Sequence, residues 1–313
     1  MRIVFMGTPD FAIPSLGILL EHGYAVVSVV TAPDKPRGRG QIVAASPIKE
    51  FAHQRTIPIL QPQVLRAPDF VSSISDLQPD LIVVVAFRIL PPEIFNIPRL
   101  GAFNLHASLL PKYRGAAPIN WAIMRGEEET GVTTFLLREK VDTGSILLQA
   151  RVRIGADESA GELHDRLADL GAQVVLQTVR SIELGSAKPI PQDDSGSSLA
   201  PKIFRDDCEI DWRKPARQIH DFVRGLSPSP CAWTKHHGKV LRIYKSELVE
   251  RGETHEHREP GVIIDASPHS AHVGTKSGVV ALAEVQQEGK RRMGIAEFLR
   301  GYPLKIGDKL GKA

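Results

Sequence analysis

The feature that most constrains the fold of this 313-residue chain is a series of short apolar runs separated by segments of helical character. Each run is bounded by turn residues, which is typical of strands buried on both faces. After the first run, apolar residues recur at helical spacing across residues 11–20, with Asp10 as the predicted cap. Strands that alternate with helices form parallel sheets, so the sequence predicts a Rossmann-like α/β domain with a mostly parallel sheet. The apolar runs are residues 2–6, 25–30, 57–60, 81–85 and 102–105.

The chain is long enough for about two domains, and a change in composition indicates where they meet. Residues 158–184 carry an apolar stripe at three- and four-residue steps, which predicts a long helix that stops at Gly185. After it the sequence turns to Pro, Ser, Gly and Asp, the composition of a linker. We therefore expect a first domain over residues 1–189, a linker over 190–207 and a second domain over 208–313.

The second domain is predicted to be rich in short strands and in basic residues. One short helix is expected over residues 216–225, and several β-type runs separated by turn residues favour a small β-barrel of the OB-like type. Residues 208–313 hold 18 Lys and Arg against 13 Asp and Glu, whereas the rest of the chain holds 21 against 23. This asymmetry fits contact with a polyanion such as nucleic acid, and equally fits ordinary solvated surface charge. The β-type runs are residues 239–244, 261–264, 271–274 and 278–282.

Composition and spacing exclude several classes of protein. Cys208 and Cys231 have no CxxC or Cys/His ligand spacing around them, so we expect neither a disulfide framework nor a metal site. No segment approaches the length of a membrane-spanning run, which predicts a soluble protein in a reducing, intracellular compartment. The turn at residues 7–10 lacks the GxGxxG spacing, so nicotinamide dinucleotide binding is not supported.

An amide, an imidazole and a carboxylate form the candidate reaction centre. Asn104 and His106 are two positions apart on a predicted strand, so both side chains lie on one face. Asp142 lies in a Val-Asp-Thr-Gly turn, from which its carboxylate could orient the imidazole, while the amide could donate to an oxygen. Such a trio suits a tetrahedral acyl intermediate. From the residues alone, a hydrogen-bonded structural histidine remains an open interpretation and is the more common role of a histidine at the end of a strand.

These residues and their neighbours resemble the signature of the 10-formyltetrahydrofolate-dependent formyltransferases. The resemblance extends over essentially the whole chain, and it implies a formyltransferase domain that uses 10-formyltetrahydrofolate as co-substrate, without a metal. It also implies that Asn104, His106 and Asp142 are the catalytic residues. The motifs are Asn104-x-His106-x-Ser108-Leu109-Leu110-Pro111, Tyr113-Arg114-Gly115-Ala116-Ala117-Pro118-Ile119, Thr130-Gly131-Val132-Thr133 and Asp142-Thr143-Gly144.

The resemblance further implies a folate pocket built from three segments of the chain. At the position of Arg88 the family usually has glycine, so this chain departs from the pattern there. Arginine would be strained if the position needed a positive φ; we expect instead that it packs beside the pterin with its long side chain turned outward. The implied pocket residues are Ser108, Leu109, Leu110, Pro111, Ala86, Phe87, Arg88, Ile89, Leu90, Leu137 and Val141.

The acceptor implied by the resemblance is the α-amino group of initiator methionyl-tRNA. A basic loop, and basic residues in the second domain, would then meet phosphates or base edges. A flexible solvated loop remains an open interpretation, as do a small-molecule acceptor (glycinamide ribonucleotide or an amino sugar nucleotide) and a non-catalytic RNA-binding protein. We expect a bacterial-type cytoplasmic location, with an organelle as the alternative, no membrane contact and no obligatory protein partner. The expected tRNA contacts are Lys35, Arg37, Arg39, Lys239 and Arg242.

Overall fold

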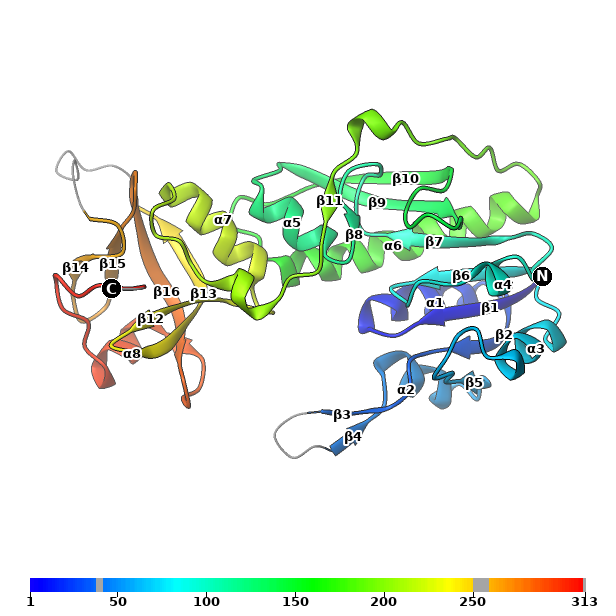
Figure 1. Cartoon of the computed structure of the whole chain (residues 1–313), viewed down its shortest axis with the longest axis horizontal. Coiled ribbons are helices and arrows are strands. Elements are labelled where there is room, and N and C mark those ends of the chain that lie inside the picture. Colours follow the sequence, from blue (N-terminus) through cyan, green and yellow to red (C-terminus); the bar gives the residue numbers. More distant parts are fainter. Residues whose placement is uncertain (38–41, 250–258, 312–313) are drawn as a thin grey trace. The chain divides into compact units, whose positions relative to one another are not determined.

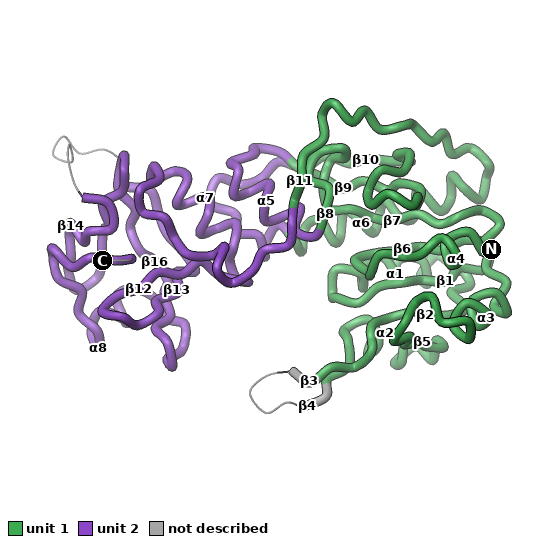
Figure 2. Tube along the Cα trace, in the orientation of Figure 1, with its two compact units in different colours: residues 1–115, 130–152, 164–200 green, residues 116–129, 153–163, 201–313 purple. Residues whose placement is uncertain are grey.

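The computed structural model describes residues 1–37, 42–249 and 259–311. The chain forms two compact units, shown in green and purple in Figure 2. Unit 1 comprises residues 1–115, 130–152 and 164–200, and unit 2 comprises residues 116–129, 153–163 and 201–313. Among the described residues, no helix is both long and apolar enough to span a membrane.

Unit 1 is built on a seven-stranded sheet with the order β10-β9-β7-β6-β1-β2-β5 (Figure 1). Neighbouring strands from β7 to β5 are parallel, and β9 pairs with β7 in the antiparallel sense. The mostly parallel sheet predicted from the apolar runs is thereby confirmed. The strands are β1 (Arg2–Gly7), β2 (Ala25–Val30), β5 (Ile59–Leu60), β6 (Leu81–Val85), β7 (Ala102–His106), β9 (Glu129–Leu136) and β10 (Ile146–Arg153).

Helices pack against this sheet, and the longest, α6 (Ala160–Glu183), follows β7 and β9 (Figure 1). The hydroxyls of Thr178 on α6 and Thr134 on β9 are hydrogen-bonded at 2.7 Å, and both residues are buried. A Cβ at Gly171 would lie 2.6 Å from a methyl of Leu105, so glycine at this position of α6 lets the helix approach the strand without displacing that side chain. The helix ends near Gly185, as the sequence predicted. The other helical segments of unit 1 are η1 (Asp10–Ala12), α1 (Ile13–Glu21), α2 (Pro47–Gln54), α3 (Pro68–Asp76), α4 (Pro92–Phe95) and η2 (Asp194–Gly196).

Two short pairs of strands complete unit 1. Strands β3 (Lys35–Arg37) and β4 (Ile42–Ala44) form an antiparallel hairpin. Strand β8 (Arg114–Gly115) pairs in parallel with β11 (Leu199–Ala200). The second pair places part of the expected linker within unit 1, beside the segment that follows the candidate reaction centre.

Unit 2 contains an antiparallel sheet with the order β12-β13-β16-β15-β14, to which β17 is added on β16. The C-terminal segment bridges the two ends of this ladder: the Gly307 N–H donates to the Ile263 carbonyl of β14 and the Gly311 N–H to the Lys235 carbonyl of β12, both at 2.9 Å, which confirms the predicted strand-rich, barrel-like domain. The expected strands and the expected helix are all present, whereas β12, β17 and α8 were not anticipated. The strands are β12 (Ala232–His236), β13 (Lys239–Leu248), β14 (Ile263–Ala266), β15 (Ala271–Gly274), β16 (Val279–Gln287) and β17 (Met293–Gly294), and the helical segments are α5 (Pro118–Met124), η3 (Arg205–Cys208), α7 (Ala216–Leu226) and α8 (Ile295–Gly301).

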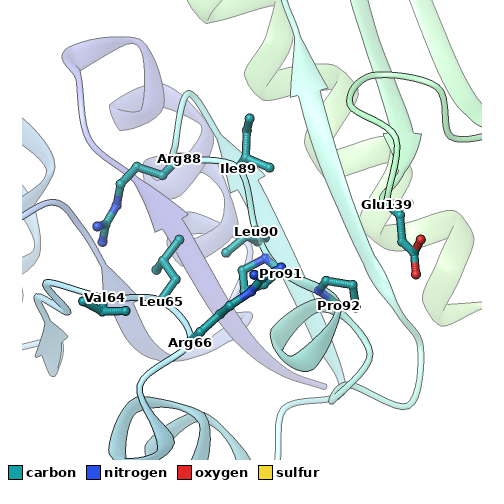
Figure 3. Close-up of a pocket in the computed structure, with 9 residues that line it drawn as sticks. All are labelled: Val64, Leu65, Arg66, Arg88, Ile89, Leu90, Pro91, Pro92 and Glu139. Atoms are coloured by element: carbon teal, nitrogen blue, oxygen red, sulfur yellow. The ribbon is translucent and has the colours of Figure 1, made fainter.

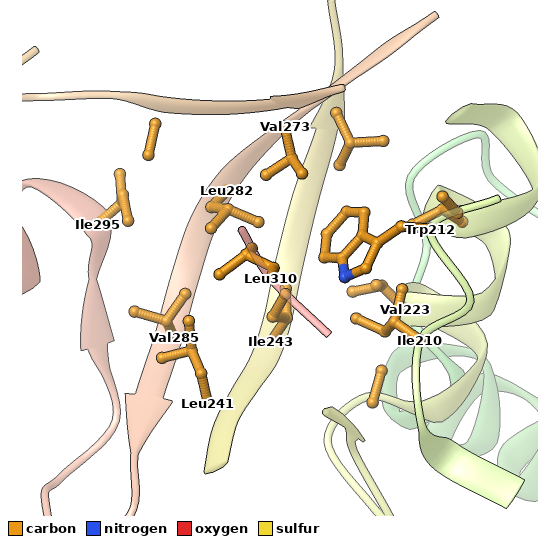
Figure 4. Close-up of a cluster of buried hydrophobic side chains, with 14 of the residues drawn as sticks. Ile210, Trp212, Val223, Leu241, Ile243, Val273, Leu282, Val285, Ile295 and Leu310 are labelled. Carbon is orange, nitrogen blue, oxygen red and sulfur yellow. The ribbon is translucent and has the colours of Figure 1, made fainter. Parts of the chain in front are cut away.

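The core of unit 2 surrounds Trp212, which lies among aliphatic side chains of the sheet and of α7 (Figure 4). Its indole N–H donates to the hydroxyl of Thr234 at 3.1 Å, so the one polar atom of the ring is satisfied. Cys208 and Cys231 are buried free thiols in this unit, and burial raises the pKa of each to about 11. Unit 2 also includes α5, which packs on α7, and residues 153–163. A single boundary within residues 190–207 does not anticipate these two contributions from the N-terminal half.

Candidate active site

Strand β7 places His106 at the carboxyl end of the parallel sheet and Asn104 two residues before it. Asn104 lies opposite Val84 of β6 and Phe135 of β9, so β7 is held by ladders on both sides. His106, the last residue of the strand, is buried, and Asn104 is half-buried. In the part of the chain that is described, the Asn104 amide makes no side-chain hydrogen bond, and it is therefore available to a ligand. Open α/β sheets bind ligands at this edge.

The His106 ring is oriented by one hydrogen bond. Its Nε2 donates to the backbone carbonyl of Tyr113 at 2.8 Å, because a carbonyl can only accept. Tyr113 has φ of 61°, a left-handed conformation that is uncommon for a bulky residue. The Phe135 ring meets the imidazole edge-on, with centroids 6.5 Å apart. Nδ1 is consequently the ring nitrogen left for chemistry.

Asp142 lies beside that nitrogen. Its Oδ2 is 4.0 Å from His106 Nδ1, and both side chains are about nine-tenths buried. The same oxygen accepts the backbone N–H of Gly115 at 2.9 Å, which aims the carboxylate. A proton on Nδ1 would point toward the carboxylate, so the imidazolium would have an acceptor at each nitrogen. The structure thus brings together the imidazole and the carboxylate that the sequence placed in one centre.

The Asp142 turn is shaped by close backbone contacts. Asp142 itself has φ of 54°, a conformation that aspartate tolerates better than most residues. A Cβ at Gly144 would lie 1.6 Å from the carbonyl oxygen of Leu136, so only glycine permits the turn to approach β9 this closely. The Asp-Thr-Gly motif is therefore explained by geometry at its first and last positions.

Gln192 and Arg114 hold the Asp142 turn and were not among the predicted site residues. Gln192 Nε2 donates to the carbonyls of Asp142 and Gly144 at 2.9 and 2.7 Å. The buried Arg114 donates to Gln192 Oε1 from Nε and Nη2 at 3.2 and 2.7 Å, and from Nη2 to Asp194 at 2.6 Å, which lowers the pKa of that carboxyl. We call these three side chains (Arg114, Gln192 and Asp194) the latch. Gln192 and Asp194 lie in the expected linker, where composition gave no signal.

The Ser-Leu-Leu-Pro segment forms a fixed turn after β7. Ser108 is buried and its hydroxyl donates to the carbonyl of Lys112 at 2.6 Å, while the Leu110 amide donates to Thr133 Oγ1 at 3.1 Å. Gln149 Nε2 donates to the Leu110 carbonyl at 2.9 Å. Leu109 and Pro111 remain partly exposed, so they are the members of this segment able to touch a ligand.

A cavity of 640 Å³ lies beside the predicted folate segments, within the size range of small-molecule sites (Figure 3). Its walls include Arg88, Ile89 and Leu90 of the predicted set, and Glu139 from between Leu137 and Val141. The rest of the predicted set, including the Ser-Leu-Leu-Pro turn, does not line this cavity. Its remaining walls, which sequence reasoning missed, are Val64, Leu65, Arg66, Pro91 and Pro92.

Two large aliphatic side chains that line this cavity are exposed. Ile89 is 71% exposed and Val64 61%, whereas Val141, which is 45% exposed, does not line the cavity. Phe87 and Leu137 instead pack against the apolar cluster that contains the buried Leu90. Exposed large aliphatic side chains gathered at a cavity are typical of a ligand site rather than of ordinary surface.

Arg88 adopts an unstrained backbone, and the positive φ in this segment belongs to Ala86, at 48°. The Arg88 guanidinium donates to the carbonyls of Pro62 and Gln63 at 2.7 and 3.1 Å. Burial lowers the pKa of this guanidinium. Instead of turning out to solvent, the side chain ties its own loop to the segment before Val64, which forms the opposite cavity wall.

The predicted tRNA contacts lie on two elements. Lys35 is exposed at the start of β3; Arg37 is on the same strand, and Arg39 lies outside the described residues. Lys239 and Arg242 are exposed on β13. In the same unit, Arg291 and Arg292 are paired with Glu297 and Glu284, which reduces the net positive charge of the basic run at residues 290–292.

Two family models match the chain: formyl transferase over residues 1–179, and formyl transferase C-terminal domain over residues 202–303. The chain belongs to the formyl transferase family. Its similar relatives are methionyl-tRNA formyltransferases. That of Porphyromonas gingivalis is 47% identical over 313 residues, covering 97% of this chain and 96% of the relative. That of Caldanaerobacter subterraneus is 47% identical over 309 residues, covering 98% and 99%.

Solved structures share the fold at low identity. The N-formyltransferase from Helicobacter canadensis, in complex with folinic acid and dTDP-3-aminofucose, has a TM-score of 0.69 at 20% identity and covers 92% of this chain and 99% of that one. HypX from Aquifex aeolicus, in complex with tetrahydrofolic acid, has a TM-score of 0.65 at 19% identity and covers 100% of this chain and 51% of that one. The resemblance to formyltransferases is confirmed for the fold and for the family.

Proposed function

We propose that this chain transfers the formyl group of 10-formyltetrahydrofolate to the α-amino group of initiator methionyl-tRNA. The observation that carries the proposal is the placement of His106 between the Tyr113 carbonyl and Asp142, next to an uncommitted Asn104 amide. The near full-length similarity to methionyl-tRNA formyltransferases supports the acceptor. Those relatives are bacterial, which supports a cytoplasmic site of action.

The reaction exchanges one carbon–nitrogen bond for another. The methionine amine attacks the formyl carbon, and negative charge develops on the formyl oxygen. Asn104, as a neutral preorganised donor, stabilises this oxygen. On collapse the bond from the formyl carbon to folate N10 breaks, so the products are the formylated amine and tetrahydrofolate.

One proton must move from the attacking amine to N10, and His106 is placed to move it. Since Nε2 is committed to the Tyr113 carbonyl, the proton is accepted at Nδ1. The imidazolium then lies beside the Asp142 carboxylate, which stabilises its charge, and it returns the proton to N10. The negative charge of Asp142 also favours formation of the His106 imidazolium. No step in this sequence requires a metal.

The folate would be held at the 640 Å³ cavity by apolar contact. Ile89 and Val64 offer exposed aliphatic surface at its walls, and Leu90 supplies the buried floor. Leu109 and Pro111 extend from the turn beside the reaction centre. The acceptor stem would meet Lys35 and the basic residues of β13. Contacts to its phosphates would fix the position of the tRNA without reading its sequence.

A direct assay tests the acceptor. The purified chain is incubated with 10-formyltetrahydrofolate and one of three amines: methionyl initiator tRNA, glycinamide ribonucleotide or a dTDP-linked amino sugar, and folate release is measured. We expect turnover with the tRNA and background with the small amines. Equal or faster turnover with a small amine would overturn the proposed acceptor. If none of the three amines gives folate release, the assignment as an enzyme would be overturned.

A further inference from the structure

Two histidines and an aspartate of unit 2 gather at one end of its sheet, remote in sequence from the reaction centre. His236 ends β12, His237 follows in the turn to β13, and Asp308 lies in the C-terminal segment. Each offers one ligand atom, and these atoms lie within 4.8 Å of one another. Residues far apart in the chain thus converge in a way that Cys and His spacing could not predict.

His236 is the unusual member of this group. Its side chain is 3% exposed, and Nε2 has no hydrogen-bond partner among the described residues. Nδ1 is 3.0 Å from the hydroxyl of Tyr302, whose ring meets the imidazole edge-on. A buried polar atom without a partner is costly, so this nitrogen calls for a ligand.

The arrangement of His236 also suits a ligand nitrogen. Metal-binding histidines commonly donate their second ring N–H to a neighbouring acceptor, which fixes the tautomer. Here Tyr302 can accept from Nδ1, leaving the lone pair of Nε2 directed at the cluster.

The spacing of the nearest two atoms fits a coordination polyhedron better than a hydrogen bond. His236 Nε2 and Asp308 Oδ2 are 3.4 Å apart, beyond the usual 2.7–3.2 Å for N–H···O. With zinc–ligand distances of about 2.0–2.2 Å, two ligands of a tetrahedral ion are separated by roughly 3.3–3.5 Å. Asp308 is already aimed, since its Oδ2 accepts the Lys305 backbone N–H at 2.7 Å.

We propose that His236, His237 and Asp308 bind a divalent ion of the zinc type, with Tyr302 orienting His236. Two imidazoles and a carboxylate are a zinc ligand set that leaves the fourth position to water. The ion would join the β12–β13 turn to the C-terminal segment. The segment contacts the sheet through the Gly311 N–H, which donates to the Lys235 carbonyl at 2.9 Å, so an ion bound here would stabilise the folded arrangement of this segment.

The decisive variant is His237→Asn. His237 and Gly238 both have positive φ, at 46° and 76°, and asparagine followed by glycine is the preferred dipeptide for such a hairpin turn. The variant therefore removes an imidazole while preserving the turn. The matched control is His272→Asn on β15. The His272 imidazole lies 3.3 Å from Asp265, but among the described residues this pair has no third metal-binding side chain beside it.

The experiment uses the full chain without an affinity tag, freed of metal by a chelator. Zn²⁺ is titrated by calorimetry, Co²⁺ by visible absorption, and the melting temperature is recorded with and without Zn²⁺. We expect one Zn²⁺ per chain, Co²⁺ bands typical of nitrogen and oxygen ligands, and a higher melting temperature with the ion. His237→Asn and Asp308→Asn should each weaken Zn²⁺ binding at least tenfold, and Tyr302→Phe about tenfold.

Formylation by His237→Asn should match the unsubstituted chain, which separates this proposal from the proposed reaction. Unchanged Zn²⁺ affinity in His237→Asn would overturn the site, as would equal loss in His272→Asn. A thiolate charge-transfer band with Co²⁺ would also overturn it, since the ligands would then be cysteines. If Asp308→Asn fails to fold, the Zn²⁺ affinities of His237→Asn and Tyr302→Phe still test the proposed site.

Discussion

The two halves of the candidate active site are held in place in different ways. Asn104 and His106 are on β7, which is hydrogen-bonded to β6 on one side and to β9 on the other. Asp142 is on a turn, and its position depends on the Gly115 N–H and on the latch. The strand half is fixed by the sheet itself, whereas the loop half is fixed by a few contacts from distant parts of the chain.

This difference separates chemistry from positioning. A change in the strand half should remove a reacting group while leaving the geometry intact. A change in the latch should leave every reacting group present but let the carboxylate move. The substitutions below test whether the two halves respond in this way.

The largest effect is expected for Asn104→Ala, which removes the donor to the formyl oxygen. We expect kcat to fall by about two to three orders of magnitude, because one preorganised donor stabilises the transition state by that amount. Folate binding and the melting temperature should change little, since the amide makes no hydrogen bond within the described residues. Unchanged turnover in a folded variant would remove Asn104 from the mechanism.

Asp142→Asn tests the loop half by removing its charge. Asparagine tolerates φ of 54° and still offers an oxygen to the Gly115 N–H, so the turn should persist. We expect kcat to fall about a hundredfold, because the imidazolium loses its counter-charge. Steady-state kinetics with saturating tRNA gives the measurement, and full activity would show that the 4.0 Å pair has no catalytic role.

Gln192→Glu tests the latch without touching a reacting group. Glutamate keeps an acceptor for Arg114 but cannot donate to the Asp142 and Gly144 carbonyls. Losing two hydrogen bonds, and placing a carboxylate against two carbonyls, should lower kcat/KM about tenfold. The control is Gln173→Glu on the exposed side of α6, which makes the same chemical change away from the site. A similar loss of kcat/KM in both variants would show that the latch does not position Asp142.

The same contrast explains how much of the fold could be predicted. The apolar runs at residues 25–30 and 81–85 coincide with β2 and β6, because buried strands have a strong local signal. No local pattern in the sequence indicated that residues 116–129 belong to unit 2. That assignment depends on the packing of α5 against α7, which no local pattern encodes.

The candidate site divides in the same way. The strand half was predictable, since the two-residue spacing of Asn104 and His106 fixes a shared face. Gln192 was not, because a glutamine within a Pro- and Ser-rich segment gives no local signal, and its role comes only from reaching Asp142 across the fold. Sequence patterns indicate which elements carry a group, whereas distant contacts decide how it is aimed.

Arg88→Ala should give the smallest effect and extends the contrast to the folate cavity. Its two hydrogen bonds to the carbonyls of Pro62 and Gln63 connect the walls, as the latch connects the Asp142 turn to the rest of the site. We expect KM for the folate to rise about three- to tenfold with kcat preserved, because only ground-state positioning is lost.

The matched control for Arg88→Ala is Arg66→Ala. Arg66 lines the same cavity, but among the described residues its charged partner is Glu93, at 3.8 Å, and both side chains are largely exposed to solvent. An exposed pair of this kind contributes little, so KM should hardly change. If the two variants raise KM equally, the effect of Arg88 is general charge attraction for the folate rather than the tie between the walls. If Arg88→Ala lowers kcat instead, the wall would belong to the reacting geometry, and the division between positioning and chemistry would fail at this side of the site.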